Sequence, residues 1–226
     1  MSRKHWLLAL IIILIIHIPV FVYLMNFKLI FNSNDFYSNE FKKYGVSRDL
    51  RGHNPDERNQ DILGYLNGKI ANIDPYFFNE KEISHMKDVK NIIHKVNMFF
   101  YILIIDIIAL IFFSYYLIKK YDKNRLKHYL KNILLYSSLS IIAISLLFWL
   151  FTTSLFNSFF GFFHSMLFPQ GNFMFDPAKD NLVVLYPEGL FADFGLRIAI
   201  YSIIVAAIML IIFFIINKNL YKRSKK

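Results

Sequence analysis

Hydrophobic residues gather into four long blocks along the chain, separated by polar segments. The blocks are Trp6–Met25, Met98–Ile118, Ile133–Phe156 and Ile198–Ile216. Each is about long enough to cross a hydrocarbon layer of roughly 30 Å as one helix. A secretory signal is the alternative for the first block, but its apolar run exceeds the roughly 7–15 residues of such a region and no small-x-small cleavage site follows. The pattern therefore predicts four transmembrane helices.

The charged residues predict the orientation of these helices. Basic residues are in excess at both chain ends and in Lys119–Lys131, which holds six basic residues and one acid. The segments 27–96 and 157–197 together hold 13 basic and 14 acidic residues. Because basic excess in short loops marks the cytoplasmic side, we expect both termini inside and the two long loops outside. The net charge of +10 is then a topology signal, and we expect no nucleic-acid partner.

We therefore expect an all-α membrane bundle of four transmembrane helices with a small mixed α/β extracytoplasmic cap. In chain order, the segments are the cytoplasmic N-terminus with the first helix (1–26), the first part of the cap (27–97), the second helix (98–118), a basic cytoplasmic loop (119–132), the third helix (133–156), the second part of the cap with an interfacial aromatic segment (157–197), the fourth helix (198–216) and a basic cytoplasmic tail (217–226).

Local patterns predict elements within the cap. Apolar positions at helical spacing predict a short amphipathic helix within 55–69. Asn79, followed three residues later by Glu82, resembles a capping box, so we expect a helix that starts near Glu80. Residues 172–175 and 182–186 are hydrophobic runs on either side of an Asp-Pro pair, and we expect them to be short strands.

Two ionisable residues interrupt the hydrophobic blocks. His17 and Asp106 each lie nine residues from the outer end of their block, so two antiparallel helices would hold them at similar depth. Ionisable groups inside a bilayer are costly and usually pair, so we expect these side chains to approach each other. The pair would be either a proton relay or a structural hydrogen bond that fixes helix packing, and the second interpretation is favoured.

Two of the seven histidines lie on the expected outer side beside apolar and aromatic neighbours. His85 shares one helical stripe with Glu82 and Asp88, and a carboxylate bonded to one ring nitrogen would leave the other nitrogen as a base. His164 lies in a Phe-rich stretch that favours the neutral imidazole. The alternative for each is an interfacial histidine bonded to the backbone.

Several other chemistries lack their residues. The chain has no cysteine, which excludes disulfides and thiol nucleophiles, and it contains no HExxH, GxSxG or P-loop motif. Two outer histidines with carboxylates are candidates for zinc, but no third ligand is evident. We therefore expect no metal and no cofactor.

The residues around both histidines resemble those of a bacterial family of four-helix integral membrane proteins that includes the lipoprotein intramolecular transacylases. The resemblance covers nearly the whole chain, although Phe173 stands where that family is expected to have tryptophan. The matching motifs are Glu82-x-x-His85-Met86-x-Asp88-Val89-Lys90, then Phe163-His164-Ser165-Met166-Leu167-Phe168, Asn172-Phe173, Leu185-Tyr186-Pro187-Glu188 and Phe191.

The resemblance implies an enzyme of the bacterial plasma membrane. Its substrate would be a diacylglyceryl lipoprotein, and the reaction would move the sn-2 acyl chain onto the α-amine of the N-terminal cysteine. The family's two catalytic histidines correspond to His85 and His164. Donor and acceptor belong to one molecule, so no enzyme nucleophile is required, which agrees with the lack of cysteine. The alternatives are a non-enzymatic membrane sensor or assembly protein, for which the two histidines would lie far apart, and a transporter, which only His17 and Asp106 suggest.

Roles for the remaining site residues are hypotheses. We expect His164 to be the base toward the amine and His85 the proton-returning partner, or the reverse, with Asp88 or Glu82 orienting His85. The Phe-rich wall, including Phe163 and Phe168, would hold acyl chains and exclude water. Further candidates for the polar headgroup are Tyr186, Glu188 and Arg197, although a plain ion pair of Arg197 with Asp193 is favoured.

Overall fold

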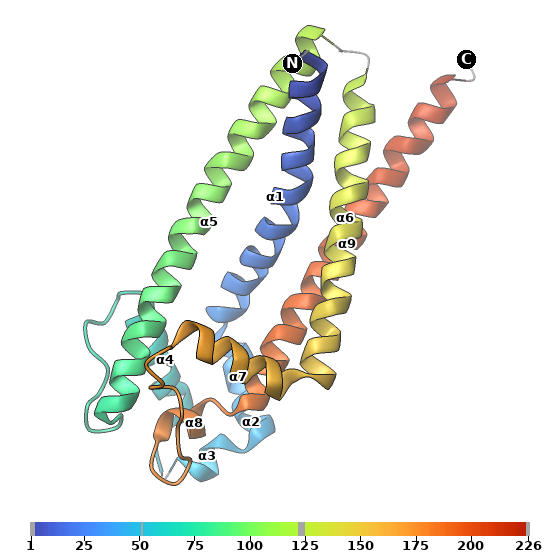
Figure 1. Cartoon of the computed structure of the whole chain (residues 1–226). Helices are drawn as coiled ribbons and strands as arrows, with labels where there is room; N and C mark the ends of the chain where they lie inside the picture. Colours follow the sequence, from blue (N-terminus) through green and yellow to red (C-terminus); the bar gives the residue numbers. More distant parts are fainter. Residues whose placement is uncertain (1–2, 51, 122–124, 225–226) are drawn as a thin grey trace. The chain divides into compact units, whose positions relative to one another are not determined.

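The computed structural model describes residues 3–50, 52–121 and 125–224, and these are organised as helices joined by turns. Figure 1 shows their order along the chain. Four of the helices, α1, α5, α6 and α9, are long and apolar enough to cross a membrane, as the four hydrophobic blocks predicted. The helices are α1 (Arg3–Phe31), α2 (Asn34–Tyr44), α3 (Val46–Asp49), α4 (Pro55–Leu66), α5 (Glu80–Tyr121), α6 (Leu126–Ser154), α7 (Phe156–Leu167), α8 (Asn181–Leu185) and α9 (Glu188–Ser224).

The strands expected for a mixed α/β cap do not occur in the described ranges, so that prediction was wrong. Residues 182–185 lie in α8, and 172–175 pass through turns without regular structure. Hydrophobic and β-branched residues favour strands only where a neighbouring strand supplies a ladder. Here the backbone N–H of Leu182 donates to the Glu82 carboxylate at 2.5 Å, and Leu182 and Leu185 are buried one helical turn apart.

The chain divides into two compact units, which we describe separately. The membrane unit consists of the described residues within 1–27, 99–148 and 198–226, and the loop unit consists of those within 28–98 and 149–197. In the membrane unit, Val22, Ile141 and Ala206 form one buried cluster and Leu7, Ile11 and Ile118 form another. Leu14, Phe100, Leu103 and Phe213 are also buried, whereas many other large hydrophobic side chains on these helices are exposed, as expected for helices whose outer faces meet lipid.

Small polar residues pack the membrane helices together. Ser137, Ser138 and Ser145 of α6 are fully buried. The Tyr23 hydroxyl lies 2.6 Å from the Ser145 hydroxyl and donates to the Ile141 carbonyl at 2.9 Å. Such hydrogen bonds between helices satisfy polar groups that lipid cannot solvate.

In the loop unit, two sequence predictions are confirmed. The amphipathic helix expected within 55–69 is α4, and its apolar stripe is buried. The capping box is formed at the start of α5: the Glu82 N–H donates to the Asn79 side-chain oxygen at 3.0 Å, and the Asn79 N–H donates to the Glu82 carboxylate at 2.8 Å. This reciprocal pairing satisfies two of the donors that a helix start leaves free.

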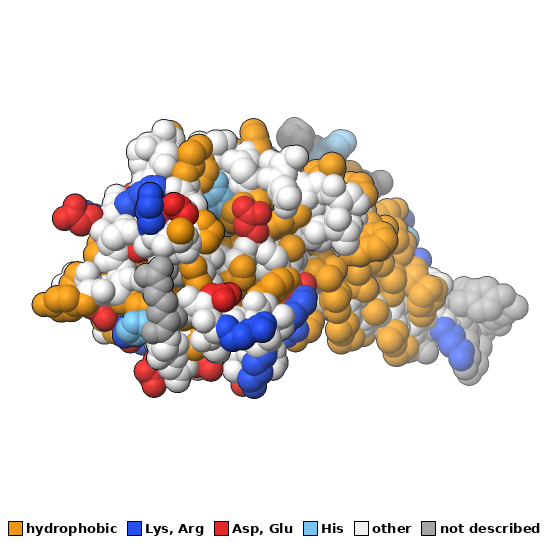
Figure 2. Space-filling view, turned by 90° about the horizontal axis from the view of Figure 1, so that it is seen from below, with side chains coloured by type: hydrophobic (Ala, Val, Ile, Leu, Met, Phe, Trp, Pro, Cys, Tyr) orange, Lys and Arg blue, Asp and Glu red, His pale blue; other side chains and the backbone are white. Residues whose placement is uncertain are grey.

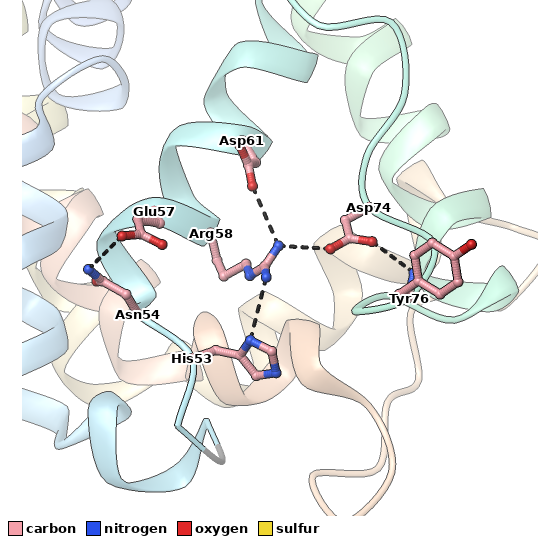
Figure 3. A network of polar contacts seen from close by, with 7 residues as sticks. All are labelled: His53, Asn54, Glu57, Arg58, Asp61, Asp74 and Tyr76. Atoms are coloured by element: carbon pink, nitrogen blue, oxygen red, sulfur yellow. Dashed lines mark hydrogen bonds and ion pairs between the residues drawn. The ribbon is translucent and has the colours of Figure 1, made fainter.

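A network around Arg58 attaches the long loop after α4 to that helix (Figure 3). Arg58 donates to Asp74 at 2.9 Å, lies 3.6 Å from Asp61 and contacts the His53 ring nitrogen at 3.4 Å. Its guanidinium also stacks on Phe77, which is buried. Figure 2 looks onto the loop unit and shows both signs of charge among hydrophobic side chains, consistent with its nearly balanced charge.

Candidate active site

The first turns of α5 and the helix α7, both in the loop unit, bring His85 and His164 together. His85 lies in the second turn of α5 and His164 near the end of α7. The ring centroids are 6.3 Å apart and the ring planes are nearly parallel, at 21°. A single polar group could bridge nitrogens on rings at this separation, so the two histidines form one candidate site.

Phenylalanine rings surround both imidazoles. Phe168 is buried and contacts both, with centroid distances of 4.4 Å to His85 and 5.6 Å to His164. Phe163 lies 5.7 Å from His164 and is more exposed. We call these rings the aromatic cage: Phe160, Phe163, Phe168, Phe173 and Phe175. His85 is buried and His164 is half-buried, so the cage limits the access of water to both rings.

His164 has a defined tautomer. Its Nδ1 lies 2.8 Å from the Phe160 carbonyl oxygen, which can only accept, so Nδ1 carries the proton and Nε2 carries the lone pair in the neutral ring. Burial among phenylalanines lowers the pKa of His164 below its ordinary value, although the Phe160 carbonyl and the Glu188 carboxylate both oppose that shift. The neutral ring with a free Nε2 therefore predominates at neutral pH.

His85 is almost fully buried, with 6% of its surface exposed. Its Nδ1 and the Asn172 side-chain oxygen are two of the buried polar atoms without a hydrogen bond among the described residues. Burial lowers the pKa of His85, and the nearby Asn172 side chain opposes this shift. The Asn172 amide nitrogen donates to Asp88 at 2.8 Å, which turns its oxygen away from Asp88. Gln170 donates to the same Asp88 oxygen at 2.5 Å.

The two carboxylates that were expected to orient His85 accept hydrogen bonds from other groups instead. Glu82 is 1% exposed, and its oxygens accept from the N–H groups of Asn79 and Leu182 rather than from His85. The Asp88 carboxylate accepts from the side chains of Asn172 and Gln170 rather than from His85. Asn172 belongs to one of the matching motifs, but the sequence alone does not predict its contact with Asp88, which lies 84 residues earlier.

Two candidates for headgroup binding are occupied by other contacts. The Tyr186 hydroxyl donates to the buried Asn59 at 2.8 Å. The guanidinium of Arg197 lies 3.8 Å from the carboxylate of the buried Glu40. The prediction that Arg197 pairs with Asp193 was therefore wrong. Asp193 instead accepts from Tyr44 at 2.6 Å and pairs with Lys43. These residues therefore hold α2, α4 and α9 in place. Glu188, by contrast, is exposed, and its negative charge opposes the lowering of the pKa of His164 by burial.

The membrane unit brings His17 and Asp106 together, with His17 Nε2 3.4 Å from the Asp106 carboxylate. The His17 Nδ1 lies 2.9 Å from the Ile13 carbonyl and donates to it. Both ring nitrogens therefore have partners. Over the described ranges, no three His, Asp or Glu side chains are grouped as metal ligands would be, here or in the loop unit.

A family model for the lipoprotein intramolecular transacylase Lit matches residues 11–191. The chain belongs to the Lit family. It is therefore an acyltransferase of lipoprotein biosynthesis, and its four apolar helices make it a multi-pass membrane protein.

Solved structures of a Lit protein share the fold of this chain. The in meso structure of the membrane integral lipoprotein intramolecular transacylase Lit from Bacillus cereus is 18% identical, with a TM-score of 0.77, and the match covers 97% of this chain and 99% of that one. The structure of the same protein with an H85R mutation is also 18% identical, with a TM-score of 0.73 and coverage of 99% and 96%. No curated protein sequence gives a significant match.

Proposed function

We propose that this Lit family member moves the sn-2 acyl chain of a diacylglyceryl lipoprotein onto the α-amine of its N-terminal cysteine, with His85 and His164 as the acid–base groups. The observation that carries the proposal is the 6.3 Å approach of the two rings inside the aromatic cage. Neither ring is a surface histidine, and the two come from helices almost 80 residues apart in sequence. Donor and acceptor are parts of one substrate molecule, so catalysis is mainly a matter of orientation and proton transfer.

The proton balance suits two histidines. A substrate ammonium carries three protons; the product amide keeps one, the glyceryl oxygen receives one and water receives the third. The amine nitrogen forms a bond to the ester carbonyl carbon, and the bond from that carbon to the glyceryl oxygen breaks. In our scheme His164 Nε2 takes the first proton, and His85 transfers the second from the amine to the leaving oxygen. The tautomer of His164 supports its role as base.

The aromatic cage favours transfer to the amine over hydrolysis. Water and the amine compete for the same ester carbonyl, and phenylalanine rings exclude water while accommodating acyl chains. Phe168 contacts both imidazoles, and we expect it to help hold the acyl chain of the reacting ester.

We also propose that the site faces the extracytoplasmic side, with both termini in the cytoplasm. The excess of basic residues in 119–131 and at the chain ends supports this orientation, because the segments that carry the histidines have nearly balanced charge.

The decisive experiment is mass spectrometry of the N-terminal peptide of a reporter lipoprotein. The chain would be expressed in a bacterium that lacks N-terminal lipoprotein acylation. We expect one acyl chain to move from glyceryl to amine, and His85→Ala and His164→Ala each to abolish the shift. His94→Ala is the matched control, because His94 is an exposed histidine on the same helix as His85. Full activity in a folded His85→Ala/His164→Ala double variant would exclude this site.

For His17 and Asp106 we propose a packing role. Both groups already have partners within the membrane unit, so the pair can stabilise α1 against α5 without moving a proton. An Asp106→Asn substitution keeps a hydrogen-bonding side chain and should preserve transfer in the reporter assay. Loss of transfer in a folded Asp106→Asn variant would favour a proton relay instead.

A further inference from the structure

The membrane unit contains an apolar groove between α1 and α5. Its volume is about 460 Å3. Leu10 and Leu117 are partly buried at its base, where Leu117 also packs on the cluster of Leu7, Ile11 and Ile118. Four exposed aromatic rings form the remaining lining: Trp6, Phe112, Phe113 and Tyr116.

The groove runs toward a positively charged end of α5. Phe112, Tyr116 and Lys120 follow one another at intervals of four residues, so they lie on one face of the helix. The Lys120 ammonium lies 3.4 Å from the Tyr116 hydroxyl and 5.6 Å from the centre of its ring. Lys119 lies over the neighbouring Tyr115 at 6.0 Å. Both lysines thus contact tyrosines, and over the described ranges neither forms an ion pair with a carboxylate.

This order of groups is complementary to one class of molecule. The apolar lining matches an acyl chain. The tyrosine hydroxyl and the indole match the glycerol region that follows it, and the lysine cations match a phosphate. Tryptophan and tyrosine favour the headgroup level of a bilayer, and lysines near that level attract anionic lipids. A zwitterionic lipid would fill the groove equally well but would carry its own cation to the lysines.

We propose that this groove binds one acyl chain of an anionic glycerophospholipid, with the lipid phosphate held by Lys120, Lys119 and the Tyr116 hydroxyl. The site is independent of the transacylase site, since none of its residues belongs to the loop unit. Its lipid is a bound component of the membrane unit rather than the substrate.

The test uses the full chain, purified and stripped of lipid, with dioleoyl phosphatidylglycerol and dioleoyl phosphatidylcholine as probes and native mass spectrometry as the readout. We expect the wild-type chain to retain phosphatidylglycerol in preference to phosphatidylcholine. Lys119→Gln/Lys120→Gln should reduce retention of phosphatidylglycerol about fivefold for each lysine and leave that of phosphatidylcholine unchanged. Phe112→Ala/Phe113→Ala should weaken retention of both lipids.

Lys95→Gln is the control, because it removes an exposed lysine from α5 at the other end of the apolar block. Three results would overturn the proposal. Equal retention of the two lipids would deny charge recognition, and an equal loss with Lys95→Gln would show general surface attraction. Full displacement of phosphatidylglycerol by excess inorganic phosphate would identify a site for the anion alone.

Discussion

At the residue scale, we predict that Asn172 controls the tautomer of His85. The Asn172 amide nitrogen donates to Asp88, while the Asn172 oxygen and the His85 Nδ1 are both buried with no other hydrogen-bond partner among the described residues. We therefore expect that oxygen to accept the Nδ1 proton of His85, which would leave Nε2 for the substrate. We predict that Asn172→Ala lowers kcat about 10- to 100-fold with little change in KM, the range seen when a group that orients a catalytic imidazole is lost.

Nitrogen-15 NMR of the histidine side chains separates this role from a structural one. The Nδ1–H tautomer of His85 should dominate in the wild-type chain and become mixed in Asn172→Ala. Asn91→Ala, an exposed position on the same helix as His85, should leave both kcat and the spectrum unchanged. An unaltered tautomer together with a reduced kcat would refute the orienting role.

The pH dependence of transfer is also determined at single residues. Burial lowers the pKa of His164, so its base form is present at neutral pH and is lost only as pH falls below the ordinary histidine value of about 6.5. Glu188 opposes this shift, because its negative charge stabilises the imidazolium. Removing that charge with Glu188→Gln should therefore lower the pKa further.

We predict that Glu188→Gln moves the acid limb of the pH–rate profile to lower pH. The rate at neutral pH should change little, since His164 is already neutral there. The measurement is the transfer rate across the acid range for both proteins, with enzyme stability checked at each pH. A limb that moves to higher pH would show that Glu188 does not act through His164.

At the element scale, the start of α9 depends on a glycine. A Cβ added at Gly189 would lie 2.5 Å from the Tyr44 hydroxyl oxygen, which donates to Asp193. We predict that Gly189→Ala destabilises the chain by about 1–3 kcal/mol, because the tyrosine ring must give up its place between α2 and α9.

The matched control is Gly161→Ala in α7, where nothing lies within 4 Å of the added carbon. There alanine should be neutral or stabilising by up to about 1 kcal/mol, since it replaces a helical glycine in open space. Thermal denaturation of both variants in the same detergent makes the comparison. Equal midpoints would show that the α2–α9 contact tolerates the methyl group.

Elements were predictable from sequence where local chemistry determines them. The capping box at Asn79 and the stripe of α4 depend on residues three and four apart, and both are confirmed. Residues 182–186 were assigned wrongly because their local preference for strand was overridden by Glu82, which caps the first turn of α8 from 100 residues away. The contact of Asn172 with Asp88 was not predictable for the same reason, since the two residues lie 84 positions apart.

At the scale of the whole molecule, the charge pattern leads to a prediction about topology. The basic segment between α5 and α6 should face the cytoplasm, and the loop after α4 should face outward, because translocating a cluster of basic residues against the membrane potential is unfavourable. The chain contains no cysteine, so a single introduced thiol reports its own side without background.

Lys69→Cys and Lys127→Cys place exposed thiols on the loop after α4 and on α6 near its start. We predict that a membrane-impermeant maleimide labels Lys69→Cys on intact cells and labels Lys127→Cys only after the membrane is opened. The two variants are matched, since each replaces one exposed lysine, and each should retain transfer in the reporter assay. The reverse labelling pattern would invert the orientation and place the two histidines on the cytoplasmic side, where a lipoprotein anchored on the outer face could not reach them.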